Sequence, residues 1–276
     1  MSSWIVLLFG VFGLSSFVFS DIQSLTGPIS LDKDGLTNWN SELAEKTLSD
    51  PQLKQKGLME CAEVKELKGT LLCASSKKVL LNKAMLRATL FSEGDAELQK
   101  GTVQSTESKF YSGSLTEILG HDIPSSELLG FWSQLEQACR RKEMCATPEE
   151  EELFKEVLLP FSQNHESFVL ISYVTNGDWL MTLNHELLHA QYFKDENFRK
   201  TVDEFWNEKI TKEDKEKIKT ILGVAYNKND EFLIRNEFQA FLLGAPASLR
   251  ARQVLRPTLP VEFKTSTFSG AMFWFP

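Results

Sequence analysis

One short segment of the chain has residue types and spacing that suit metal chemistry: His185-Glu186-Leu187-Leu188-His189. In a helix, residues four apart lie on one face, so both imidazoles could bind the same metal ion. Glu186 would then lie beside that ion, where a carboxylate can act as general base for a water molecule. The pattern therefore predicts a zinc site with a catalytic base.

A catalytic zinc ion usually has three protein ligands, and no histidine follows His189 to provide the third. Glu237 is the strongest candidate, because small Ala240 lies one turn later and would let its helix approach the histidine helix closely. Asp195 is a weaker candidate, since no glycine precedes it to turn the chain back to the metal. Glu231 is another, but it lies six positions before Glu237 and would point to a different face of that helix.

This order of residues resembles that of the gluzincin metallopeptidases, in which HExxH is followed on a later helix by a glutamate ligand, often in an NExxA-like setting. Residues 236–240 of this chain read NEFQA. The resemblance concerns motif and order only and covers residues 167–245. It implies that His185, His189 and Glu237 bind zinc and that Glu186 is the general base. Asn236 would be a polar residue next to the third ligand.

Many gluzincins stabilise the oxyanion of the transition state with a downstream histidine or tyrosine. Because this chain has no downstream histidine, the resemblance points to Tyr226, with Arg235 as the alternative. The simpler interpretation of Tyr226 is a partly buried aromatic residue whose hydroxyl reaches the surface. His121 and His165 are each isolated in the sequence and are interpreted as structural histidines.

The flanking sequence predicts an α+β fold that is mainly α-helical and zincin-like, with a strand before the HExxH helix and a ligand helix after it. Residues 167–175 read SFVLISYVT and precede Asn176-Gly177, which predicts a strand and a turn. That strand could be either the edge on which an extended substrate lies or an ordinary core strand. An extended apolar tail is expected after Pro257. Helices are predicted at 51–67, 81–91, 125–141, 147–158, 179–193, 211–222 and 231–243.

Residues 4–19 are uncharged and mostly apolar, and small residues follow at a suitable distance, which predicts a signal peptide over residues 1–20. A retained membrane anchor is the alternative, although a span needs about 20 apolar residues.

The four cysteines form two close pairs without a CxxC arrangement, Cys61 with Cys73 and Cys139 with Cys145. They predict two local disulfides, with buried free thiols as the alternative. The signal peptide and the disulfides together predict a secreted or periplasmic protein that is not stably inserted in a membrane.

The 276 residues, of which 42% are hydrophobic, can bury a substantial core. A formal charge of −8 argues against nucleic acid as a partner. The expected organisation is a signal peptide at 1–20, a mainly helical N-terminal region at 21–165 and a zincin-like metal-binding region at 166–276. The absence of repeats and flexible linkers also allows residues 21–276 to fold as one packed unit.

These expectations combine into an exported zinc metallopeptidase that acts on a peptide or protein substrate. Zinc would polarise the scissile carbonyl and acidify a water molecule, while Glu186 would pass the proton to the leaving amine. One alternative is an exported binding or structural protein that retains a metal site without turnover. Another is a zinc amidase that cleaves cell-wall crosslinks.

Overall fold

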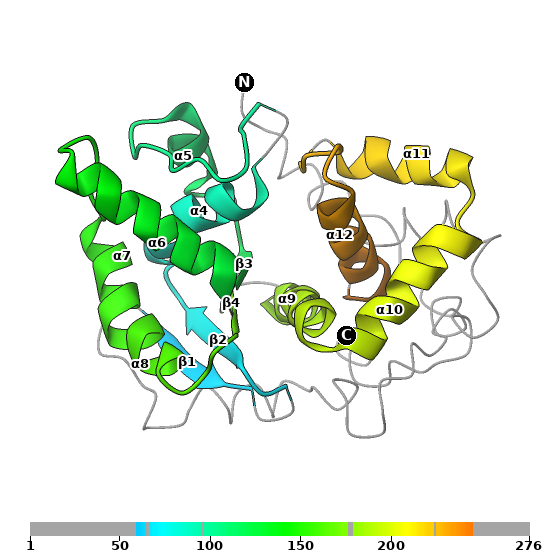
Figure 1. Cartoon of the computed structure of the whole chain (residues 1–276), viewed down its shortest axis with the longest axis horizontal. Helices are drawn as coiled ribbons and strands as arrows, with labels where there is room; N and C mark the ends of the chain where they lie inside the picture. Colours follow the sequence, from blue (N-terminus) through cyan, green and yellow to red (C-terminus); the bar gives the residue numbers. More distant parts are fainter. Residues whose placement is uncertain (1–58, 65–66, 95–96, 176–178, 224, 245–276) are drawn as a thin grey trace.

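The computed structural model describes residues 59–64, 67–94, 97–175, 179–223 and 225–244, and these residues form an α+β fold around one mixed sheet (Figure 1). The sheet has four strands, in the order β1-β2-β4-β3. β2 and β4 are parallel, and each outer strand pairs antiparallel with its neighbour. The strands are β1 (Glu60–Glu63), β2 (Thr70–Ser75), β3 (Gly120–Pro124) and β4 (Val169–Val174).

One face of the sheet is covered by helices that precede β4 in the chain (Figure 1). Ile123 of β3 and Leu170 of β4 project from this face and pack with Met85 and Phe131 of the helices in one buried cluster. Short α5 packs on α4 through a smaller cluster that contains Tyr111. These helices are α4 (Lys78–Glu93), α5 (Lys109–Ser114), α6 (Ser125–Arg140), α7 (Pro148–Glu152), the π-helical turn η2 (Leu153–Leu158) and α8 (Leu159–Ser162).

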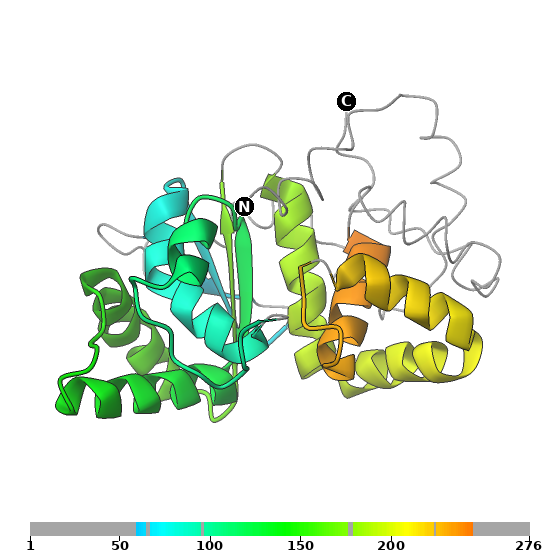
Figure 2. The ribbon, with the colours of Figure 1, turned by 90° about the horizontal axis from the view of Figure 1, so that it is seen from above.

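Among the described residues, the helix on the opposite face of the sheet is α9 (Trp179–Lys194) (Figure 2). Leu183 and Leu187 of α9 pack on Ile171 of β4. The other side of α9 contributes Leu188 to a second buried cluster, which is built around Trp206. The helices of that cluster are α10 (Glu196–Glu204), the π-helical turn η3 (Phe205–Lys209), α11 (Lys212–Leu222) and α12 (Glu231–Gly244). Helix α9 is therefore buried on two sides.

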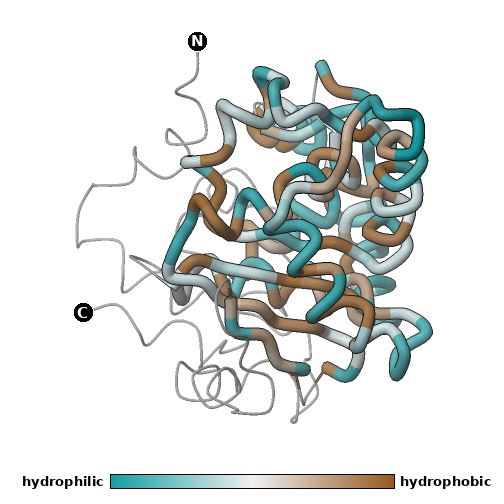
Figure 3. Tube along the Cα trace, turned by 90° about the vertical axis from the view of Figure 1, so that its left-hand side faces the viewer, coloured by the Kyte–Doolittle hydropathy of each residue, from teal (hydrophilic) through white to brown (hydrophobic). Residues whose placement is uncertain are grey.

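Several helix starts are fixed by side chains that accept hydrogen bonds from the first turn. Thr147 and Glu150 form a reciprocal capping box at the start of α7. Thr211 caps α11 through Asp214 N–H at 3.1 Å, and Asp230 accepts from Leu233 N–H at 3.0 Å at the start of α12. Hydrophobic and hydrophilic residues alternate along the coiled traces of Figure 3, as expected for helices with one face on a core.

The predicted strand at 167–175 is β4, but it lies between β2 and β3, so the interpretation of it as the substrate edge is wrong. The edge strand next to α9 is β3. The predicted helix at 51–67 is also wrong where it is described, because residues 60–63 form β1 through pairing with β2. Residues 51–58, the signal peptide and the tail after Pro257 lie outside the described residues.

Both predicted disulfides are confirmed. Cys61 and Cys73 are directly opposite each other on β1 and β2, so their link joins the two strands across the pair. Cys139 and Cys145 close a short loop between α6 and α7.

Three strands of the sheet precede residue 165 and one follows it, so the sheet contains strands from both sides of the predicted domain boundary. No helix within the described ranges is long and apolar enough to cross a bilayer.

A buried ion pair joins α4 to α7. Arg87 and Glu150 are both fully buried, and Arg87 Nε donates to Glu150 Oε1 at 2.7 Å. The guanidinium also donates to the main-chain carbonyls of Gln104 and Cys145, at 3.2 and 3.0 Å. Arg87 therefore holds together α4, the start of α7 and the disulfide loop, a role that the acidic run at 149–152 did not reveal in the sequence.

Replacing Arg87 should destabilise the protein strongly. Arg87→Met leaves the Glu150 carboxylate buried without its partner, which should lower the free energy of unfolding by about 3–5 kcal/mol. Lys83→Met is the matched control on the same helix, because Lys83 pairs with Glu149 at 3.2 Å but its side chain is 41% exposed. That control should cost less than about 1 kcal/mol. Urea unfolding of both variants measures the difference, and equal losses would contradict a dominant role for the buried pair.

Candidate metal centre

Helices α9 and α12 approach each other closely enough to hydrogen-bond across their interface. Gln239 Nε2 donates to the Leu188 carbonyl at 3.2 Å, and both Gln239 and Ala240 are buried. The ring of His185 hydrogen-bonds the main-chain carbonyl of Ala240. The small side chain of Ala240 permits this approach, as the sequence suggested, and it places Glu237 opposite the two histidines of α9.

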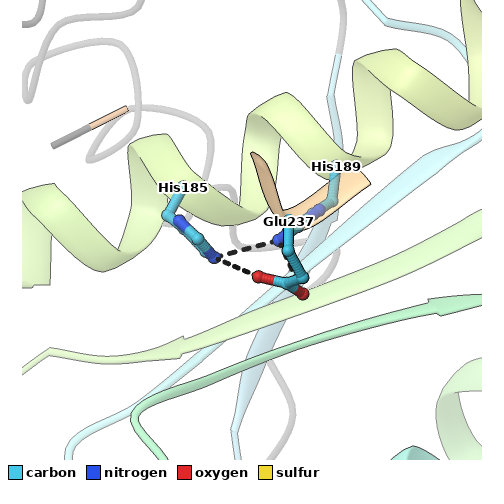
Figure 4. Close-up of side chains that lie close together, drawn as sticks. All are labelled: His185, His189 and Glu237. Atoms are coloured by element: carbon cyan, nitrogen blue, oxygen red, sulfur yellow. Dashed lines mark hydrogen bonds and ion pairs between the residues drawn. The ribbon is translucent and has the colours of Figure 1, made fainter. Parts of the chain in front are cut away.

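The two histidines and Glu237 point toward one another (Figure 4). Their donor atoms are separated by 3.0 Å between the two Nε2 atoms, 3.5 Å from His185 Nε2 to Glu237 Oε2 and 3.6 Å from His189 Nε2 to Glu237 Oε1. Zinc bonds of 2.0–2.2 Å in a tetrahedral site place neighbouring ligand atoms about 3.3–3.6 Å apart. The three predicted ligands therefore form a group that could hold one metal ion.

Both histidines are suited to act as neutral ligands. Burial is the main cause that lowers the pKa of His185 to about 4 and the pKa of His189 to about 4. Metal binding requires an unprotonated ring nitrogen. At neutral pH neither imidazole therefore has to lose a proton before it binds a metal ion.

Glu186 lies between the histidine helix and the edge strand β3. Its carboxylate is 6% exposed, and its Oε2 has no hydrogen-bond partner among the described residues. The space that it fills is opened by Gly120, because a Cβ atom on that residue would lie 2.8 Å from Glu186 Cδ. The backbone of β3 and the missing side chain of Gly120 therefore set the position of the predicted base.

Four carboxyl groups share the space around this centre. Burial, followed by mutual repulsion, raises the pKa of Asp122, Glu186 and Glu93 well above their ordinary values. Burial also raises the pKa of Glu237, although His189 and Tyr226 partly oppose that shift. Lys100 lowers the pKa of Glu93 in part, as a positive charge nearby would. A divalent cation would supply the positive charge that this group of carboxylates needs.

Tyr226 lies at the centre, with its hydroxyl hydrogen-bonded to Glu237. Burial, followed by repulsion from Glu237, raises the pKa of Tyr226 well above its ordinary value. The phenol therefore remains protonated and can donate a hydrogen bond. The hydroxyl faces the predicted ligand, in contrast to the simpler interpretation that it reaches the surface.

The weaker candidates have other partners. Asp195 caps α10 by accepting from Phe198 N–H at 3.0 Å, and Glu231 accepts from Trp206 Nε1 at 3.0 Å. Arg235, the alternative to Tyr226, lies 3.7 Å from Asp203. The isolated histidines are bonded elsewhere: His121 to Thr89 and Asn82, and His165 to Glu63 and the Phe161 carbonyl.

Sequence reasoning missed Asp122, Glu93 and Gly120. Asp122 also forms a second group of possible ligands with Glu186 and His189. Asp122 and Gly120 are on β3, whose sequence GHDIP has no alternating β-branched pattern, so the strand itself was not expected. Glu93 ends α4, more than ninety residues before the histidines. The even spacing of Gly120 and Asp122 would have signalled a shared face only after β3 was known.

Comparison with protein-family models, with curated proteins and with solved structures finds no match to this chain. The chemistry of the site is therefore argued from its own residues.

Purified full-length chain should contain about one zinc ion when it is prepared without chelators, because one set of donors has tetrahedral spacing. Glu237→Gln should weaken zinc binding beyond the roughly 10–100-fold that follows the loss of an outer partner. Free zinc at 100 times its Kd should raise the unfolding free energy of the unaltered chain by about 2.7 kcal/mol.

Elemental analysis and competition with a chromophoric chelator measure zinc content and affinity. Glu231→Gln is the matched control, because Glu231 is on the same helix but hydrogen-bonds Trp206. Asp195→Asn keeps a capping side chain and tests the other candidate ligand. Zinc content that survives in Glu237→Gln, or is lost in either control, would contradict the assignment of the third ligand.

Proposed function

We propose that this chain is a zinc metallopeptidase of the gluzincin type that hydrolyses peptide bonds. The proposal rests on one observation: two imidazole nitrogens and one carboxylate lie 3.0–3.6 Å from one another. A second carboxylate, that of Glu186, directly follows the first histidine on α9. The order of these residues along the chain supports the gluzincin assignment. A zincin-like arrangement of the sheet and α9 is part of the same proposal.

His185, His189 and Glu237 would hold the zinc ion. Zinc bound there would supply a Lewis acid that polarises a carbonyl group and lowers the pKa of a water molecule. Glu186, whose buried Oε2 has no hydrogen-bond partner among the described residues, would accept a proton once the charge of the zinc ion favours its ionised form, and would then donate it to the leaving amine. The Tyr226 hydroxyl, which hydrogen-bonds Glu237 in this structure, would turn from that carboxylate to donate its one proton to the oxyanion.

The edge of the sheet suggests how an extended peptide could bind. β3 pairs with β4 on one side, and within the described parts of the chain no strand pairs with its other side. Extended peptides commonly bind to such an edge through main-chain hydrogen bonds. Because Gly120 of β3 adjoins Glu186, a peptide on this edge would lie next to the proposed base. A peptide or protein is therefore the substrate class that the site fits best.

We propose that the protein is exported, to a secreted or periplasmic location. The support is the pair of disulfides, since structural disulfides persist mainly in oxidising compartments. The apolar leader sequence at residues 4–19 points in the same direction.

Glu186→Gln should separate metal binding from catalysis. Glutamine fits the same space but cannot accept the proton, so kcat should fall by about 10²–10⁴-fold while zinc content stays near that of the unaltered chain. A quenched-fluorescence peptide library measures hydrolysis, and elemental analysis measures zinc. Undiminished hydrolysis in this variant would remove the peptidase proposal. If neither the unaltered chain nor Glu186→Gln hydrolyses peptides while both bind zinc, the result would favour a binding or structural protein without turnover. If the unaltered chain cleaves only cell-wall fragments, the result would favour a zinc amidase.

Gly120→Ala should reduce turnover by displacing the base. The added methyl group would crowd the end of the Glu186 side chain and the Thr182 methyl group on α9, so both side chains must shift, and a thermal unfolding scan checks that the variant still folds. A displacement of about 1 Å should lower kcat by about 100-fold. Gly113→Ala is the matched control, because a Cβ atom there meets nothing within 4 Å. Equal turnover of the two variants on the same peptide would show that β3 does not position Glu186.

A further inference from the structure

The two histidines of the centre differ in what their rings contact away from the other ligands. The His185 ring has an acceptor in the main-chain carbonyl of Ala240. The His189 Nδ1 atom is buried and makes no hydrogen bond of good geometry within the part of the chain that the structure describes, although the Asn236 side chain lies beside the ring. A histidine that binds a metal ion through one nitrogen almost always donates from the other, which fixes the orientation of the ring. An acceptor for His189 Nδ1 is therefore to be expected nearby.

The group that faces His189 Nδ1 is the carboxylate of Asp122, whose Oδ2 lies 3.9 Å away. Asp122 is 8% exposed, and the charged side chains that act on it among the described residues are the carboxylates of Glu186, Glu93 and Glu237. A shift of about 1 Å would bring the pair to the 2.7–2.9 Å of a charge-assisted hydrogen bond.

The position of Asp122 is fixed by the strand that carries it. Because side chains alternate along a strand, Asp122 and Gly120 face α9 while His121 and Ile123 face the helices on the other side. His121 anchors β3 to α4 through Thr89 Oγ1 at 2.7 Å and Asn82 Oδ1 at 2.9 Å. Asp122 is therefore held against His189 by a strand that is itself fixed from behind.

We propose that Asp122 is a positioning residue, whose carboxylate accepts a hydrogen bond from His189 Nδ1 and so holds Nε2 toward the metal ion. The edge strand of the sheet thus contributes to the metal centre, together with α9 and α12. This inference concerns metal binding and does not depend on peptide hydrolysis.

Two other arrangements involve the same atoms. Asn236 is the rival acceptor, because its side chain interacts with the His189 ring and its Oδ1, which accepts from Gln239 Nε2 at 3.2 Å, has a second lone pair. It is neutral, so its hydrogen bond to a metal-bound imidazole would be weaker than that of the Asp122 carboxylate. Asp122, Glu186 and His189 Nδ1 could alternatively hold a second metal ion. That arrangement would occupy the carboxylate of Glu186 and require both nitrogens of one imidazole to bind metal, so a single hydrogen bond accounts for the geometry more simply.

The test measures zinc affinity in four full-length variants by chelator competition. Asp122→Ala removes the acceptor and should lower zinc affinity by about 10–100-fold. Asp122→Asn removes the charge but keeps an acceptor oxygen, so it should recover most of that loss. Glu93→Gln removes a nearby carboxylate that does not face His189, and Asn236→Ala removes the rival acceptor. Both of these should cost less than Asp122→Ala.

Nitrogen NMR of the zinc-loaded protein provides a readout that a general effect on folding would not produce. A slowly exchanging Nδ1–H signal of His189 should be present in the unaltered chain and in Asp122→Asn, and absent from Asp122→Ala. The proposal is overturned by unchanged affinity in Asp122→Ala, by an equal loss in Asp122→Asn or Glu93→Gln, or by a larger loss in Asn236→Ala. Two zinc ions per chain, one of them lost in Asp122→Ala, would replace it with the second metal site.

Discussion

The removal of several neighbouring carboxyl groups from water is the constraint on which the centre of this structure depends. Asp122, Glu186, Glu237 and Glu93 come from a strand and three helices, and all four have a raised pKa. Removing such groups from water is unfavourable unless they are paired or bound to a cation. The two neutral histidines add donor nitrogens without adding positive charge. A cation shared among its members would favour the ionised form of all four groups.

The packing around α9 makes this sharing possible. One side of the helix rests on the sheet through Leu183 and Leu187, and the other side joins the cluster around Trp206. The histidines lie on the strip between these contacts, so the same packing that buries α9 directs His185 and His189 toward α12. Because the ligands are far apart in the sequence, the geometry of the site is set by tertiary packing and cannot form in either helix alone.

The sequence predicted most reliably those features that depend on residues close together in the chain. The i, i+4 histidines and the caps at Thr147 and Thr211 depend on contacts within one or two turns, and helices were found at those places. The strands β2 and β3 were missed because their stability comes from pairing with β4, which is remote in the chain. Asp122 was missed for the same reason: its relation to His189 exists only across the sheet edge.

Metal binding and folding should be coupled, because the candidate ligands and the carboxyl groups around them come from α9, α12 and β3. Without a cation, burial and proximity favour the protonated forms of the carboxyl groups on α9, α12 and β3, because their pKa values are raised. A bound divalent ion would favour the ionised carboxylates and attract these elements to one another, so its binding free energy would add to the stability of the interface. The helices beyond α9 should therefore gain more from the ion than the helices on the far face of the sheet, which share the buried pair of Arg87 and Glu150 instead.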